Sequence, residues 1–223
     1  MQPSSFQSLT PDDCQRTDEW LGLEINRIEL DLLKVAQTTL PTGDVSSWGK
    51  SMHDAQSWVG LHPQTLLTPY QELSWMCECV KDQSGHVVDL GAGYGRLGMV
   101  MQQKLPKAFY TGVEIVRERV DEGNRIFGLL GSEKARLIAA DLATTSYELP
   151  MGDCYFIYDY GTLDHIRWTM GQLQNLSDIH RFQIVARGAG IRSLIDMAHP
   201  WLHKIENPYE EYFSLYQTHL TYS

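Results

Sequence analysis

The 223-residue sequence lacks an apolar stretch near the length of about eighteen residues that a membrane span requires, and its first ten residues have neither a basic start nor an apolar run. We therefore expect no membrane span and no signal or transit peptide, and we expect a cytoplasmic protein. Basic residues are few, since 18 Lys and Arg stand against 28 Asp and Glu, for a net charge of −10. A protein that gains affinity by neutralising phosphates has the opposite balance, which argues against nucleic acid as the main partner.

Cysteine is also scarce, and the four cysteines form no CxxC pair. Cys77 and Cys79 fall in an apolar stretch that resembles a helix. We interpret Cys14, Cys77, Cys79 and Cys154 as reduced core thiols, and we expect no bound metal.

The amino-terminal part of the chain has helical periodicity. From Asp18 to about Thr38, apolar residues recur at spacings of four and three, which predicts one long amphipathic helix. Its stripe faces a core or a second copy of the chain, so a homodimer through this helix is one expectation. The mixed segment from Asp44 to His62 is interpreted as a structured linker. The stripe consists of Leu21, Ile25, Ile28, Leu32 and Val35.

A second helix is predicted from Pro69 to about Lys81. Thr68 is suited to the N-cap, Pro69 to the first helical position, and Gln71 completes a capping box. The pattern changes after Gly85, so we divide the chain into a helical cover, residues 1–84, and a catalytic domain, residues 85–223.

Short apolar runs alternate with helical segments after Gly85, which predicts a doubly wound, mostly parallel sheet. The turn 207–211 between the last two runs is too short for a helical crossover, so these runs should form an antiparallel hairpin at the sheet edge. The predicted strands are His86–Leu90, Phe109–Glu114, Leu137–Ala140, Cys154–Tyr158, Phe182–Ala186, Trp201–Ile205 and Tyr212–Thr221.

The run 87–98 is the most specific signal, because it joins a buried strand, an acid at the strand's end and a series of glycines that open a helix. Ligands of open α/β sheets bind at the carboxyl ends of the strands, where glycines let the backbone approach closely. Glu114 ends the next strand, 25 residues past Asp89, and can accept hydrogen bonds from ribose hydroxyls. Together these residues predict a nucleoside-type site.

Asp89-x-Gly91-x-Gly93-x-Gly95, Glu114 and Asp141 resemble the cofactor motifs of class I S-adenosylmethionine-dependent methyltransferases. The resemblance covers residues 86–223 as a fold and implies a seven-stranded, Rossmann-like sheet with S-adenosylmethionine (SAM) as cofactor. In that family the first acid and its glycines hold the methionine end, the second acid binds the ribose, and the third lies near the adenine. These roles fall on Asp89, Gly91 and Gly93, on Glu114, and on Asp141 with Leu142.

Two other readings of the glycine run stay open. Gly93-x-Gly95-x-x-Gly98, with Glu114 21 residues past Gly93, also spells a dinucleotide fingerprint, so an NAD(P)-dependent oxidoreductase is an alternative. Against it, the glycines start late after the strand, and little chain follows Gly98 for a substrate domain. A non-catalytic binding module built on the same fold is the other alternative.

Methyl transfer is an in-line displacement that depends mainly on positioning. The family places groups that orient the acceptor at the end of strand four, where we name Asp159 and Tyr160, with His165 as a candidate general base. The Asp-Asn pair that metal-dependent catechol-type enzymes carry after strand five is absent, and so is the Asn/Asp-Pro-Pro-Tyr motif of nucleobase and glutamine methyltransferases.

Thr68-Pro69-Tyr70-Gln71-Glu72 resembles, in its position 21 residues before Asp89, the cofactor-contacting segment of the non-SET histone lysine methyltransferases. This similarity implies that Thr68 and Tyr70 contact the cofactor and that the amino-terminal region covers it. The Asn-Asn-Phe-type motif and the basic tail of those enzymes are absent. Residues 1–85 hold 12 acidic and 5 basic residues, which would attract a basic partner, so we place a protein lysine or other amine first as acceptor and a small molecule second.

Overall fold

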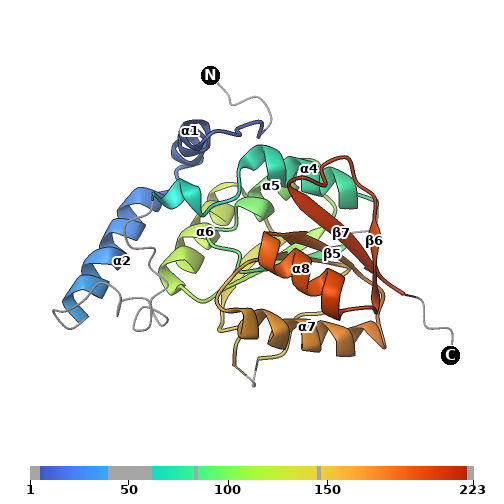
Figure 1. The fold of residues 1–223 in the computed structure, drawn as a ribbon. Helices are drawn as coiled ribbons and strands as arrows, with labels where there is room; N and C mark the ends of the chain where they lie inside the picture. The colour runs from blue at the N-terminus through green and yellow to red at the C-terminus, as the bar shows by residue number, and fades with distance from the viewer. Residues whose placement is uncertain (1–5, 40–61, 83–84, 145–146, 220–223) are drawn as a thin grey trace.

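The computed structural model describes residues 6–39, 62–82, 85–144 and 147–219. A seven-stranded sheet in the order β3-β2-β1-β4-β5-β7-β6 forms its centre (Figure 1). The first five strands pair in parallel, and β7 runs antiparallel to both β5 and β6. The predicted fold is confirmed, including the hairpin. The strands are β1 (His86–Leu90), β2 (Phe109–Glu114), β3 (Ala135–Ala139), β4 (Cys154–Tyr158), β5 (Gln183–Arg187), β6 (Leu202–Ile205) and β7 (Phe213–Thr218).

Helices cover both faces of the sheet, and alternate residues of the central strands supply the two cores. Val87, Phe156 and Val185 face the core on one side, whereas Val88 and Ile157 face the other. None of the helices in the described ranges is long and apolar enough to cross a membrane. The first face carries α4 (Tyr70–Val80), α5 (Arg96–Lys104) and α6 (Arg117–Leu129), and the second carries α7 (Leu163–Ser177) and α8 (Ala189–Ala198) (Figure 1).

The amino-terminal region forms two helices, α1 (Pro11–Leu21) and α2 (Ile25–Thr39), so the prediction of one long helix was wrong. Gly22 has a φ of 79°, and its amide donates to carbonyls in the last turn of α1, which ends that helix. Ile25 and Ile28 join the core of the α4–α6 face, whereas Val35 is 60% exposed. The homodimer and the division into cover and catalytic domain stay predictions, and the predicted linker 44–62 lies outside the described residues except for His62.

Helix α4 begins at Tyr70, and Pro69 occupies its N-cap without a side-chain capping bond, so the capping box predicted at Thr68 does not form. The amide of Gln71 instead donates to the carbonyl oxygen of Ser8 at 3.1 Å. A residue distant in sequence therefore supplies an acceptor to the start of this helix.

The four cysteines are free thiols, as predicted, and three of them are buried. Burial raises the pKa of the Cys77 thiol, which keeps it neutral. Within the described ranges, no three His, Cys, Asp or Glu side chains are grouped as a metal ion would require.

Candidate functional site

A cavity of about 300 Å³ lies at the carboxyl edge of the sheet. The ends of β1, β2, β4 and β5 line it, together with Pro63, residues 65–68 and one side chain of α2. Parallel strands bring their carboxyl ends to one edge, which explains why residues far apart in sequence meet here. Of the predicted site residues, the cavity is lined by Thr68, Asp89, Gly91, Gly93, Glu114, Asp159 and Tyr160.

The glycine loop between β1 and α5 forms one wall of the cavity. Gly91, Gly93 and Gly95 have φ values of 82°, 55° and 74°, a left-handed region that favours glycine. The amides of Gly91 and Ala92 both donate to the carbonyl oxygen of Val113, at 2.9 and 3.0 Å, which fastens the loop to β2. A Cβ on Gly91 would lie 3.1 Å from the Cβ of Tyr160. The loop thus holds its backbone close to the cavity.

Glu114 ends β2 and is almost fully buried at 6% exposure. Its Oε2 accepts a hydrogen bond from the amide of Gly93 at 2.9 Å, and its Oε1 accepts one from the amide of Val116 at 3.0 Å. Glu114 therefore braces the glycine loop as well as lining the cavity. The sequence predicted its position but not this contact.

Glu29 of α2 also lines the cavity, and the sequence analysis missed it. It accepts hydrogen bonds from Arg119 at 2.8 and 3.0 Å and from the hydroxyl of Tyr94 at 2.7 Å. A guanidinium nitrogen of Arg119 also lies 3.7 Å from Oε1 of Glu114. The charged groups of Glu29, Arg119 and Glu114 therefore lie in a row. Helical periodicity places Glu29 on the polar face of its helix. Nothing in the neighbouring sequence distinguishes it from a solvent-exposed glutamate.

Asp89 is 2% exposed, and its Oδ2 accepts a hydrogen bond from the hydroxyl of Tyr110 at 2.8 Å. Its Oδ1 has no hydrogen-bond partner among the described residues, although the residue lines the cavity. Burial raises the pKa of Asp89 to about 7, against the lowering effect of the Tyr110 bond, and the charge of Glu114 adds to the increase. A buried carboxylate oxygen without a partner is suited to a cationic ligand group.

Asp89 should make the stability of the protein depend on pH. The folded state retains this proton up to about pH 7, whereas an unfolded aspartate loses it near pH 3.8, so the contribution of Asp89 is complete below about pH 4 and is lost as the pH rises through 7. Asp89→Asn removes this pH-dependent contribution to the free energy of unfolding. We expect the stability of the variant relative to wild type to increase by roughly 2 kcal/mol between pH 5 and pH 8 in urea unfolding. A difference that does not change with pH would contradict the shifted pKa.

The end of β4 presents Tyr158, Asp159 and Tyr160 to the cavity. The carboxylate of Asp159 accepts hydrogen bonds from the amides of Gly190 and Ile191, at 3.0 and 2.7 Å, and so caps α8. The hydroxyl of Tyr160 donates to Thr169 of α7, and burial raises its pKa. Both side chains have structural partners, and their catalytic roles stay predictions.

A smaller hollow of about 30 Å³ adjoins the cavity and shares Gly91, Glu114 and Tyr160 with it. Asp141, Leu142 and His165 line this hollow. The structure thus groups His165 with the two residues predicted near the adenine, whereas Asp159 lines the larger cavity.

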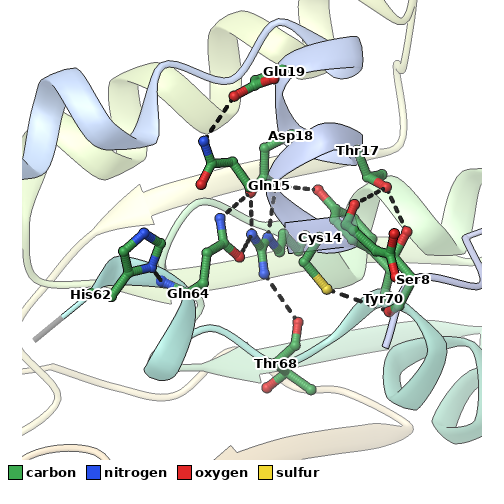
Figure 2. Close-up of polar contacts among 12 residues, drawn as sticks. Ser8, Cys14, Gln15, Thr17, Asp18, Glu19, His62, Gln64, Thr68 and Tyr70 are labelled. Carbon is green, nitrogen blue, oxygen red and sulfur yellow. Dashed lines mark hydrogen bonds and ion pairs between the residues drawn. The ribbon is translucent and has the colours of Figure 1, made fainter. Parts of the chain in front are cut away.

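Tyr70 does not line the cavity. It is fully buried, its ring stacks on Phe6 with centroids 5.3 Å apart, and its hydroxyl donates to Asp18 at 2.7 Å. Figure 2 shows the polar contacts around Asp18, with His62 and Tyr70 on opposite sides and Thr68 at the lower edge. Of the two residues predicted to cover the cofactor, Thr68 alone borders the cavity.

The order of the strands, the reversed β7 and the glycine loop at the end of β1 are those of the class I methyltransferase fold. Among solved structures, the SAH-bound methyltransferase PaMTH1 from Podospora anserina aligns with a TM-score of 0.57 at 11% identity, over 86% of this chain and 96% of its own. The pyocyanin biosynthetic protein PhzM aligns with a TM-score of 0.52 at 17% identity, over 79% of this chain and 62% of its own.

TrmN from Thermus thermophilus aligns with a TM-score of 0.48 at 16% identity over 68% of this chain, which spans 48% of the length of TrmN. No protein-family model matches the sequence, and no curated protein matches it. The likeness to PaMTH1 and PhzM is one of fold.

Proposed function

We propose that the protein is a SAM-dependent methyltransferase whose cofactor binds in the cavity at the carboxyl edge of the sheet. The observation that carries the proposal is the buried, unpartnered Oδ1 of Asp89 beside the glycine loop and Glu114. In this proposal Asp89, Gly91 and Gly93 hold the methionine end, and Glu114 holds the ribose. Asp141 and Leu142 border the adenine in the smaller hollow.

The charges around the cavity support a cationic ligand. Each arginine of the lining is paired with a carboxylate, Arg96 with Asp18, Arg119 with Glu29 and Arg187 with Glu72. Asp89 has no such partner among the described residues, so a ligand ammonium group would compensate its charge. SAM, when bound, supplies a methyl group on a sulfonium, and the chain's own residues hold the reactants in line and exclude water.

We place a protein lysine or another amine first as acceptor. The end of β5 pairs with the start of β7, Arg187 opposite Phe213, so the preceding turn lies at the same edge as the cavity. Two tyrosines of this turn, Tyr209 and Tyr212, contact Trp75 of α4 with ring centroids 4.8 and 5.1 Å apart. Aromatic rings beside exposed Glu211 favour a cationic side chain.

A small-molecule acceptor is the second candidate. Pro63 and residues 65–68 close one side of the cavity, which favours a compact substrate. PhzM, which shares the fold, is named for the biosynthesis of a small molecule.

Calorimetry with S-adenosylhomocysteine (SAH), the demethylated product of SAM, tests the cofactor. We expect micromolar binding of SAH and none of NAD(H) or NADP(H). Binding of a nicotinamide dinucleotide without SAH would favour the oxidoreductase instead. Radiolabelled SAM, offered with lysine-rich peptides in one arm and small-molecule extracts in the other, then separates the two acceptor classes by the size of the labelled product.

A further inference from the structure

A buried polar cluster joins the amino-terminal helices to the glycine-loop helix. Arg96, the first residue of α5, is 4% exposed and forms an ion pair with Asp18 of α1, which is 1% exposed. Figure 2 shows Gln64 and Tyr70, both from the segment 62–70, directed at Asp18, and Arg96 also donates to the carbonyl oxygen of Thr68 in that segment. The sequence analysis assigned no role to Asp18, Gln64 or Arg96.

Both carboxylate oxygens of Asp18 are fully used. Oδ1 accepts from Arg96 at 2.9 Å and from the hydroxyl of Tyr70 at 2.7 Å. Oδ2 accepts from Gln64 at 2.6 Å and from a second guanidinium nitrogen of Arg96. One carboxylate thus ties together α4, α5 and the 3₁₀ turn Pro63–Thr65.

Arg96 extends this cluster to the cavity wall. One guanidinium nitrogen donates to the side-chain oxygen of Gln64 at 2.6 Å, and another donates to the carbonyl oxygen of Thr68 at 3.3 Å. The guanidinium also lies 4.8 Å from the ring centroid of Tyr70. Pro63, residues 65–68 and Arg96 itself line the cavity, so Arg96 holds this wall both at Gln64 and at Thr68.

Burial of such a pair is weak evidence for stability, because the desolvation of two charges offsets much of their attraction. Its clearest effect is on geometry, since six hydrogen bonds fix the directions of the groups around the pair. A cluster of this kind at the wall of a ligand cavity is suited to holding the wall residues in fixed positions.

We propose that Asp18 and Arg96 are positioning residues of the cofactor pocket. They fix residues 62–70 as a preorganised wall against the glycine loop, so that the cofactor binds without having to order this segment. The identity of the ligand rests on the proposed function. The ordering of residues 62–70 by Asp18 and Arg96 does not depend on the identity of the ligand. It can be measured in the ligand-free protein.

The test compares Asp18→Asn with the control Glu19→Gln, which removes one carboxylate from an exposed position of the same helix. In Asp18→Asn we expect the amides of residues 62–70 to exchange hydrogen at least tenfold faster without ligand, while those of α7 and α8 exchange as in wild type. We also expect the Kd for SAH to rise at least tenfold. Glu19→Gln should change neither quantity.

Unchanged exchange of residues 62–70 and an unchanged Kd in a folded Asp18→Asn protein would overturn the proposal, even if the melting temperature fell. If Asp18→Asn does not fold, Gln64→Met retains the ion pair but cuts the link to the wall, and it should show the same two changes to a smaller degree. If wild type does not bind SAH, the proposed function fails, and the exchange measurement still decides the positioning role.

Discussion

Replacing Glu114 with alanine is expected to raise the Kd for SAH by tenfold or more. The carboxylate is the proposed partner of the ribose hydroxyls, and hydrogen bonds to a charged group contribute about 1.5 to 3 kcal/mol. The substitution also leaves the amides of Gly93 and Val116 without their acceptor. The loss of affinity should therefore include a looser glycine loop as well as a lost ligand contact.

Glu114→Gln separates these two contributions, because the amide retains one oxygen that can brace the loop but carries no charge. We expect its Kd, measured by calorimetry, to lie between those of wild type and Glu114→Ala. Glu118→Ala, at an exposed acid four residues along the chain, is the matched control and should bind as wild type does. An unchanged Kd in Glu114→Ala would remove Glu114 from the cofactor site.

Gly123→Ala should strongly destabilise the protein. A Cβ on Gly123 of α6 would lie 2.3 Å from Leu137 Cδ1 and 2.6 Å from the carbonyl oxygen of Tyr94. The leucine side chain can move, but the Tyr94 carbonyl belongs to the backbone of the glycine loop. We expect a loss of about 3 kcal/mol in the free energy of unfolding, from overpacking.

Gly171→Ala in α7 is the control for helix propensity, because no atom outside that helix lies within 4 Å of its added Cβ. It should stabilise the protein by about 0.5 to 1 kcal/mol. Urea unfolding of both variants measures the difference. A Gly123→Ala protein as stable as wild type would show that α6 can move away from the loop without cost.

The sheet could be predicted from the sequence because each of its signals is local. Parallel strands buried on both faces appear as short apolar runs, and the limits of β1, β2 and β4 agree with the prediction. The glycine loop could also be predicted from the sequence, because a positive φ such as that of Gly91 is rarely adopted by other residues. Asp89 and Glu114 followed from their places at strand ends.

The other half of the site depends on contacts between distant segments. Asp18 and Arg96 are 78 residues apart, and Glu29 and Arg119 are 90 apart. Nothing in the periodicity of α1 or α2 marks Asp18 as buried or Glu29 as half-buried, because an acid at that spacing is typical of a solvated helix face. The failed capping box has the same origin, since Ser8 supplies an acceptor that local reasoning assigned to Thr68.

These separations affect how the chain can fold during synthesis. At about 5 to 20 residues per second, the arginine partners of Asp18 and Glu29 are made roughly 4 to 18 seconds after those acids. Until then α1 and α2 lack the partners in α5 and α6 that hold them, and contacts of such long sequence separation form slowly. The two amino-terminal helices are therefore made first, but they can dock only after α5 and α6, which carry these arginines, have been made.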